Sequence, residues 1–207
     1  MTLFKSLAWM KKKKTVLLMP GSRVQEVKSL LPCMLEAAEK LSRDHGDMQF
    51  LVPRATTIDR AMLDDIIEAS GVPVTVGEGN VYDMMNISTA AIAASGTATL
   101  ETTLMGLPTL LVYRVNRLTY WLSKVLVHIE SIGLPNIIMG RRVIPELWQD
   151  DVTPDNITDA VLPMLDDGPR RTELCEGFPP CAVRWENRGC HAYSQSCLNF
   201  CKRKRYS

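Results

Sequence analysis

Two short turns that contain glycine carry residue types able to hold a phosphate group. The first is Pro20–Arg23 and the second is Ser95–Thr97, and each follows an apolar run and precedes residues at helical spacing. Backbone N–H groups and the positive end of a helix dipole make such a turn an anion site, and glycine lets a ligand approach the backbone closely. The alternative interpretation is a helix capped by Ser95 or Thr97 in an ordinary α/β protein.

A carboxylate near the second turn adds a further element of nucleotide recognition. Glu101 lies about one helical turn beyond Ser95–Thr97, where its oxygens could accept hydrogen bonds from two sugar hydroxyls. Phosphate together with ribose is what a nucleotide offers. From the local pattern alone, a nucleotide site and a capped helix both stay open.

Alternating strands and helices must position these turns. The spacing of apolar residues predicts strands at Thr15–Met19, Gln49–Val52, Val72–Val76, Ile87–Ala94 and Thr109–Tyr113, and helices over 27–41, Thr57–Ala69 (ended by Gly71), Val81–Met85 and Thr97–Met105. Units of about 30 residues predict an α/β fold, a parallel sheet with helices on both faces. Such sheets bind ligands at the carboxyl ends of their strands, so we expect both turns to face one crevice.

Four shorter elements are predicted after the last of these strands. They are an amphipathic helix over Leu118–Ile129, an extended segment at Leu134–Ile138, a short helix that begins at Pro145, and a last helix from the cap Thr153 to about Leu165. Pro32 is expected to kink the first helix or to start its main part. The apolar face of 118–129 favours core packing over membrane contact.

The totals indicate a globular protein of one domain or slightly more. The chain has 207 residues, 46% of them hydrophobic and 23% charged, and a net charge of +1. We find no apolar run of the roughly 20 residues that span a bilayer. Residues 1–14 are expected to be a leader outside the domain, and their lysines follow the apolar patch, which is the reverse of a signal peptide. The body is therefore expected to be cytoplasmic.

The segment 168–207 differs in composition from the rest. It shows no sustained period, contains five of the six cysteines, and ends in the basic run Lys202–Arg205. Its cysteine spacings include no CxxC pair, so we predict no metal site. A basic run can bind nucleic acid or acidic lipid, but a disordered tail is favoured. A segment read in a shifted frame is the remaining alternative.

Five blocks in order resemble a known family over about three quarters of the chain. They are Leu18–Arg23 with Glu26-Val27 and Leu30–Pro32, Ser95–Glu101, Tyr113-Arg114, Leu134–Ile138, and Pro145–Leu147 with Gln149. In this order the blocks resemble the carboxyl-terminal domain of lipid-A-disaccharide synthase. The resemblance implies the Rossmann-like, UDP-binding half of a GT-B glycosyltransferase, with residues 15–167 as the UDP-sugar-binding domain.

The family's reaction defines the expected partners. It transfers a diacylated glucosamine from its UDP donor to the acceptor lipid X, which yields a β-1,6-linked disaccharide and UDP. The resemblance implies no metal, no cofactor and no nucleic acid, and it implies a cytoplasmic enzyme of a Gram-negative type of bacterium with peripheral contact to the inner membrane.

The resemblance also implies roles for individual residues. The backbone of Ser95–Thr97 would approach the diphosphate, Glu101 would bind the ribose, and Arg23, with Ser22 beside it, would offset charge on the departing UDP. The residues expected to line the donor site are Asn136, Glu146 and Gln149.

The match covers only about half of the parent enzyme. The family's acceptor domain, which carries the general base, is not matched, so we expect no catalytic residue in this chain and no activity of the isolated chain. Two alternatives remain: a half-domain of another UDP-sugar transferase or epimerase, and a nucleotide-binding module without catalysis.

Overall fold

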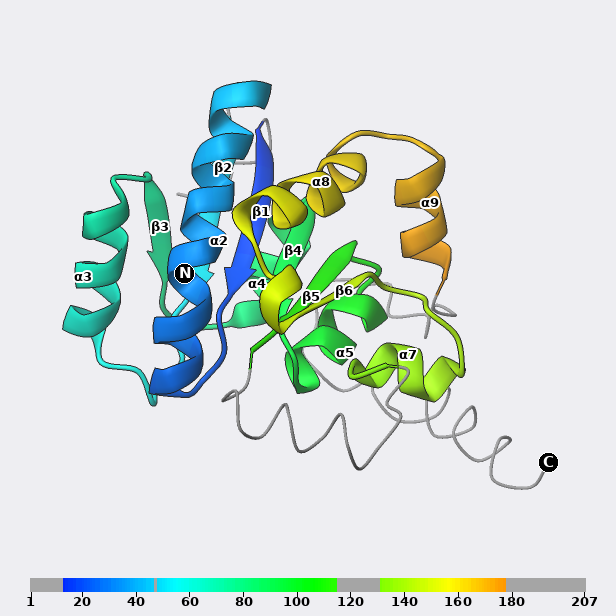
Figure 1. Cartoon of the computed structure of the whole chain (residues 1–207), viewed down its shortest axis with the longest axis horizontal. Coiled ribbons are helices and arrows are strands. Elements are labelled where there is room, and N and C mark those ends of the chain that lie inside the picture. Colours follow the sequence, from blue (N-terminus) through cyan, green and yellow to red (C-terminus); the bar gives the residue numbers. More distant parts are fainter. Residues whose placement is uncertain (1–12, 47, 115–130, 178–207) are drawn as a thin grey trace.

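A six-stranded parallel sheet forms the centre of the computed structural model, which describes residues 13–46, 48–114 and 131–177. The spatial order of the strands is β3-β2-β1-β4-β5-β6 (Figure 1). The strands are β1 (Lys14–Met19), β2 (Met48–Pro53), β3 (Val74–Gly77), β4 (Ala90–Ala94), β5 (Thr109–Tyr113) and β6 (Glu146–Trp148). All five neighbouring pairs are parallel, so every strand ends at the same edge of the sheet.

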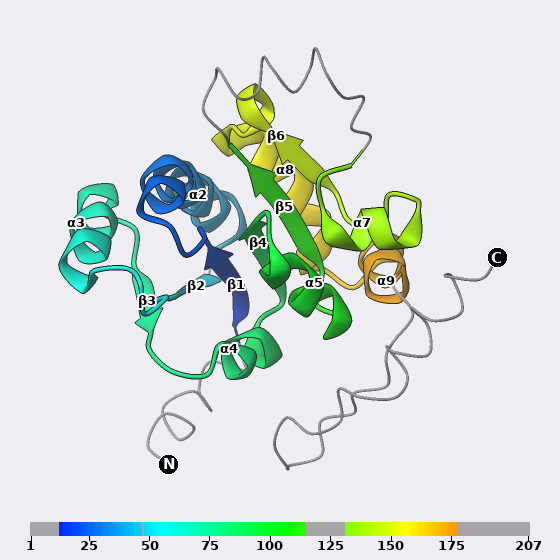
Figure 2. The ribbon, with the colours of Figure 1, turned by 90° about the horizontal axis from the view of Figure 1, so that it is seen from below.

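Helices cover both faces of this sheet, which confirms the predicted α/β fold (Figure 2). They are α2 (Val24–His45), α3 (Arg60–Ser70), α4 (Val81–Ile87), α5 (Thr97–Leu104), α7 (Leu134–Met139), α8 (Pro154–Leu165) and α9 (Pro169–Glu176), with the 3-10 turn η2 (Gln149–Asp151) after β6. Helices α2, α3, α8 and α9 contribute side chains to the core on one face, and α4, α5 and α7 to the cores on the other.

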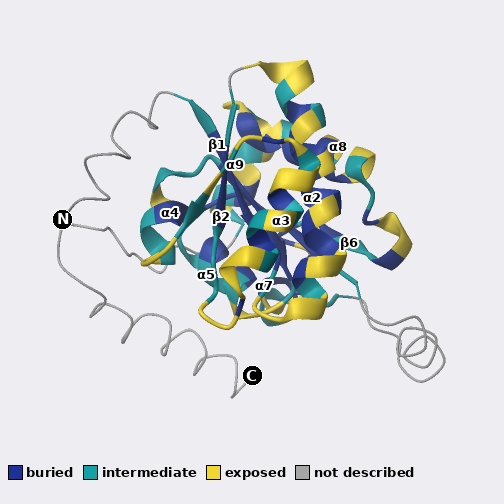
Figure 3. Cartoon of the chain, turned by 90° about the vertical axis from the view of Figure 1, so that its left-hand side faces the viewer, coloured by how far each residue is buried: buried dark blue, intermediate teal, exposed yellow. Residues whose placement is uncertain are grey.

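The central strands are apolar on both sides because both faces are covered. In β1, Val16 and Leu18 pack beneath α2 and α8, whereas Leu17 and Met19 pack toward α4. Near-continuous apolar runs of this kind are typical of buried parallel strands. Figure 3 shows buried residues at the strands and on the inner sides of α2 and α3, with exposed residues on their outer sides.

The segment after residue 131 differs from the prediction at its start. The extended segment predicted at Leu134–Ile138 is wrong, because these residues form the helix α7. Pro135 stands in the first turn, where a helix needs no N–H from it, and Gly140 ends the helix in the left-handed conformation with φ 61°.

The short helix predicted to begin at Pro145 is also wrong. Residues Glu146–Trp148 form the edge strand β6, in register with β5 so that Leu111 stands opposite Glu146. The carbonyl of Pro145 accepts a hydrogen bond from the N–H of Leu111. A proline just before an edge strand removes no ladder donor, so it is compatible with this pairing.

Other boundaries agree with the prediction or move by a few residues. Helix α2 starts at Val24 and continues through Pro32, so Pro32 does not start it. Gly71 ends α3 with φ 69° and Thr153 caps α8, both as predicted. Helix α9 lies in the segment for which no regular structure was expected, and its Leu174 is buried in the core.

Several predictions fall on residues beyond this description. The amphipathic helix over Leu118–Ile129, most of the 1–14 leader and the basic run at the C-terminus lie outside the described residues. Within the described part of the chain, no helix combines the length and apolar character needed to cross a bilayer.

Candidate functional site

The strand order reverses between β1 and β4 at the centre of the sheet. The chain leaves β1 for α2 on one face and leaves β4 for α5 on the other (Figure 2). In open α/β sheets such a reversal forms a crevice at the carboxyl ends of the two strands, and ligands bind there. Met19 and Ala93 are partners in the ladder, so the turns that follow them begin side by side. The topology therefore places both predicted glycine turns at one edge, as expected.

Both helices that start at this crevice begin without a side-chain cap. Arg23 is the N-cap residue of α2 and Gly96 that of α5, and neither residue has a side chain that accepts a hydrogen bond from the first N–H groups of its helix. The predicted cap by Ser95 or Thr97 is therefore wrong. By contrast, side chains cap the N-termini of α3, α4 and α8, namely Asp59, Asn80 and Thr153. The first N–H groups of an uncapped helix are available to an anion.

The turn before α5 is open to solvent at its glycine. Gly96 has φ 158° and ψ −164°, a region that side chains rarely adopt. A β-carbon built on Gly96 would meet no other heavy atom within 4 Å. Gly96 and Thr97 are exposed and Ser95 is half-buried, so a ligand can approach this backbone directly.

The turn before α2 is shaped by a carboxylate. Gly21 has φ 107°, and a β-carbon there would lie 2.3 Å from Oε2 of Glu26. The other oxygen, Oε1, accepts a hydrogen bond of 2.8 Å from Nη1 of Arg23, whose side chain is 81% exposed. Thr57 donates its hydroxyl to the carbonyl of Ser22 at 2.6 Å, which fixes the turn from the β2 side.

Glu26 is a residue of this turn that the sequence reasoning did not single out as a site residue. Its spacing of three residues from Arg23 was the available signal, because side chains three apart on a helix are neighbours. The pair holds the Arg23 guanidinium over the start of α2.

Glu101 lies on α5, one helical turn beyond the open glycine. It is half-buried, and its Oε1 accepts a hydrogen bond of 3.1 Å from the hydroxyl of Tyr82 on α4. Its Oε2 has no hydrogen-bond partner among the described residues. This leaves one oxygen for a hydroxyl of a ligand, and no sequence signal had paired Tyr82 with it.

Glu146 is the centre of a closed polar cluster, which we call the Glu146 knot. Its two oxygens accept four hydrogen bonds, from the backbone N–H groups of Ile132 and Gly133, from the side-chain amide of Asn136 and from the indole of Trp148. Glu146 is only 9% exposed. These contacts tie α7 and the residues before it to β6.

Asn136 uses its whole hydrogen-bonding capacity within the knot. Its Oδ1 accepts from the N–H groups of Val143 (2.6 Å) and Ile144 (2.9 Å), and its Nδ2 donates to the carbonyl of Ile144 (2.9 Å) and to Glu146 (2.6 Å). An asparagine amide has two donors and two acceptor positions. Asn136 is 1% exposed, so nothing of its amide remains for a ligand.

Gln149 directly follows β6, so it lies at the carboxyl-end edge of the sheet, where the crevice is expected. Among the described residues other than glycine it is the only one with positive φ, at 50°. Its carbonyl accepts a hydrogen bond of 3.4 Å from Nε of Arg114, the residue that follows β5. Strained backbone of this kind persists only where neighbouring contacts hold it.

A charged network stands at the same edge, beyond β2 and β3. Arg54 and Arg60 donate hydrogen bonds to Oε1 of Glu78, at 2.9 and 3.3 Å. These two guanidinium groups hold the pKa of the exposed Glu78 carboxyl below its ordinary value. The described residues contain no group of His, Cys, Asp and Glu side chains that could hold a metal ion.

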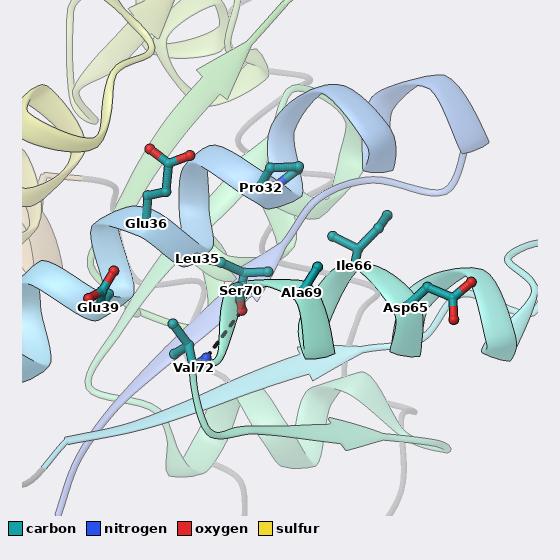
Figure 4. A pocket seen from close by; sticks show the side chains of 9 residues that line it. All are labelled: Pro32, Leu35, Glu36, Glu39, Asp65, Ile66, Ala69, Ser70 and Val72. Atoms are coloured by element: carbon teal, nitrogen blue, oxygen red, sulfur yellow. Dashed lines mark hydrogen bonds between the residues drawn. The ribbon is translucent and has the colours of Figure 1, made fainter.

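A hollow of about 500 Å³ between α2 and α3 lies away from this edge (Figure 4). Its floor is apolar, with Leu35, Ile66 and Val72 among the lining residues, while Glu36, Glu39 and Asp65 also line it. Carboxylates repel a diphosphate, so this hollow is not the anion site that the turns predict.

Comparison with known proteins decides the family. A family model described as lipid-A-disaccharide synthetase matches residues 3–176. The chain belongs to this family. It is 42% identical over 164 residues to the lipid-A-disaccharide synthase of Myxococcus xanthus and 41% identical over 165 residues to that of Nitrosococcus oceani. These matches cover 79% and 80% of this chain and 43% of each relative, so the chain spans about two fifths of their length.

Solved structures agree on the fold. A protein from Listeria monocytogenes described as a UDP-N-acetylglucosamine 2-epimerase matches with a TM-score of 0.60 and 15% identity, over 84% of this chain and 42% of that one. The trehalose-6-phosphate synthase OtsA matches with a TM-score of 0.51 and 11% identity, over 84% and 41% of the two chains. These likenesses confirm the Rossmann-like fold found in GT-B glycosyltransferases. The family match disfavours a different UDP-sugar enzyme.

Proposed function

We propose that this chain is the UDP-sugar-binding part of a lipid-A-disaccharide synthase. The observation that carries the proposal is the pair of uncapped helix N-termini, α2 and α5, at the one point where the strand order reverses. Residues 15–167 form the binding unit in this proposal. The nucleotide and the sugar named in this proposal are those expected from the family to which the chain belongs.

The chemistry of sugar transfer requires groups of this kind. When the glycosidic bond to the diphosphate breaks, the leaving UDP gains negative charge. Fixed donors stabilise that charge in the transition state without having to reorganise. In this proposal the N–H groups of Gly96 and Thr97 contact one phosphate, because the N–H of Ser95 already donates to the carbonyl of Val112 at 3.2 Å. Arg23 with the backbone at Ser22 contacts the other phosphate.

Of the remaining predicted residues, some contact the ligand in this proposal and the others hold the surrounding chain in place. Glu101 uses its second oxygen for a ribose hydroxyl, while Tyr82 holds the first. Gln149 borders the donor site at the end of β6. Asn136 and Glu146 support this border through the Glu146 knot rather than through a contact with the ligand.

The complete reaction belongs to the full-length family in this proposal. The donor is the UDP-linked diacylglucosamine, the acceptor is lipid X, and the general base lies in the part of the relatives that this chain does not match. The proposed setting is the cytoplasmic side of the inner membrane, with peripheral contact. On this basis the isolated chain binds UDP and forms no disaccharide.

A titration of the chain with UDP, followed by backbone amide shifts in NMR, tests the proposal. We expect a dissociation constant between about 1 mM and 1 μM. The shifts should cluster at 21–24 and 95–99, and amides near the hollow of Figure 4 should not move. Uridine serves as the matched control, because it lacks the diphosphate and should bind more weakly. An unchanged spectrum at both turns would refute the proposal.

A further inference from the structure

Arg114 joins three separate segments at the edge of the crevice. Nη1 donates to the carbonyl of Ser29 on α2 at 3.0 Å, Nε donates to the carbonyl of Gln149 at 3.4 Å, and Nη2 donates to the carbonyl of Val152. The acceptors come from the second turn of α2 and from both ends of the loop that follows β6. Arg114 itself directly follows β5.

The register of the sheet explains why Arg114 reaches this loop. Tyr113 and Trp148 are ladder partners, so the next residues, Arg114 and Gln149, leave the edge next to each other. The loop then closes on itself, because the N–H of Val152 donates to the carbonyl of Gln149 at 3.2 Å. Arg114 donates to the carbonyls of both Gln149, which has a positive φ, and Val152, so it contacts the two ends of this closed turn.

Only a guanidinium can make this set of contacts. Its N–H groups point in fixed directions within one plane, so three of them can reach three carbonyls at once, whereas a lysine offers a single nitrogen. Three acceptors of Arg114 are backbone carbonyls, which do not neutralise its charge. The geometry is that of a clamp on backbone positions.

We propose that Arg114 is a positioning residue of the donor site, which fixes the start of α2 and the strained Gln149 turn relative to each other. This inference rests on the proposed UDP-sugar function. Because α2 carries one anion-binding N-terminus and Gln149 borders the same edge, release of the clamp lowers UDP affinity while the sheet remains folded.

The test compares two substitutions of Arg114 with matched changes of Arg43, an exposed arginine at the far end of α2 that pairs only with Glu39 among the described residues. R114K retains the charge and loses the planar set of donors, while R114A loses both. UDP affinity, urea unfolding and backbone amide shifts are measured for R114K, R114A, R43K and R43A.

We expect about a tenfold loss of UDP affinity in both R114K and R114A and no change in R43K or R43A. Without UDP, the amide shifts of the Arg114 variants should change at 24–30 and 149–153 and stay constant in the sheet strands. Added guanidinium ion should restore part of the affinity of R114A and should leave that of R43A unchanged.

Two results would overturn the positioning role. One is an R114K variant that binds UDP like the wild type, which would leave charge as the only contribution. The other is a loss of affinity that follows the unfolded fraction alone. If the wild-type chain itself gives no response to UDP, the proposed function fails and this inference fails with it.

Discussion

The two glycine turns and the Glu146 knot both contain polar residues named by the same family resemblance, yet their surroundings are opposite. At the turns, two helix N-termini lack side-chain caps and the Arg23 side chain is 81% exposed. In the knot, Asn136 and Glu146 are buried and bond to each other and to nearby backbone. The turns present groups that a ligand can reach, whereas the polar groups of the knot are bonded within the chain.

This difference separates two reasons for which a polar residue is required. A buried polar group stabilises a fold only when its hydrogen bonds are complete, so its loss affects stability first. An exposed group beside unbonded N–H donors contributes little to stability, so its loss affects binding first.

Replacement of the central carboxylate should have the largest effect on stability. Glu146→Ala leaves four donors without an acceptor in the interior, and we expect a loss of about 4 kcal/mol in the free energy of unfolding. Urea unfolding measures this. Glu68→Ala, an exposed glutamate on α3, is the control and should change stability by less than about 0.5 kcal/mol. Equal stability of the two variants would contradict the structural role of the knot.

A side chain at the first turn should disturb both stability and binding. Gly21→Ala places a β-carbon 2.3 Å from Glu26 and keeps φ at 107°, so Glu26 must move and Arg23 with it. We expect a cost of about 2 kcal/mol together with weaker UDP binding. Gly46→Ala, where φ is 78° and no atom lies within 4 Å, should cost about 1 kcal/mol and leave binding unchanged. Identical UDP affinity in both variants would argue against a role for this turn.

Removal of the exposed guanidinium should affect binding alone. For Arg23→Ala we expect about a tenfold loss of UDP affinity, equal to about 1.4 kcal/mol, with a stability change below about 0.5 kcal/mol. Calorimetric titration and urea unfolding give the two values. Arg43→Ala removes a comparable exposed ion pair on the same helix and should bind UDP like the wild type. A loss of stability without a loss of affinity would reverse the comparison.

The smallest effect concerns the pH dependence of stability. The pKa of Glu78 is lowered in the folded chain by Arg54 and Arg60. A lowered pKa in the folded state gives a contribution that is complete above the unfolded value of 4.5 and is lost as the pH falls through the lower folded value. In that acidic range, the free energy of unfolding of Glu78→Gln should therefore depend less steeply on pH than that of the wild type. Between pH 6 and pH 7 the variant and the wild type should show the same pH dependence. A curve parallel to that of the wild type would contradict the coupling.

Periodicity and turn chemistry predicted most of the sheet. The strands from Thr15 to Tyr113 and the glycine turns between them are local features, since apolar runs and glycine positions act within a few residues. The same local patterns were insufficient after residue 131. The segments at Leu134 and Pro145 are short, and whether each becomes a helix or a strand depends on partners distant in the sequence, α5 and β5.

The sequence by itself determined the family, the parallel sheet and the two turns that precede α2 and α5. Only the tertiary structure decided which polar residues are available, because availability depends on hydrogen-bond partners that come from other segments. The side-chain amide of Asn136 is occupied by hydrogen bonds with Val143, Ile144 and Glu146. Glu101 accepts a hydrogen bond from Tyr82, which lies on another helix. The clamp of Arg114 on α2 and on the Gln149 turn exists only because the register of β5 and β6 brings these residues together.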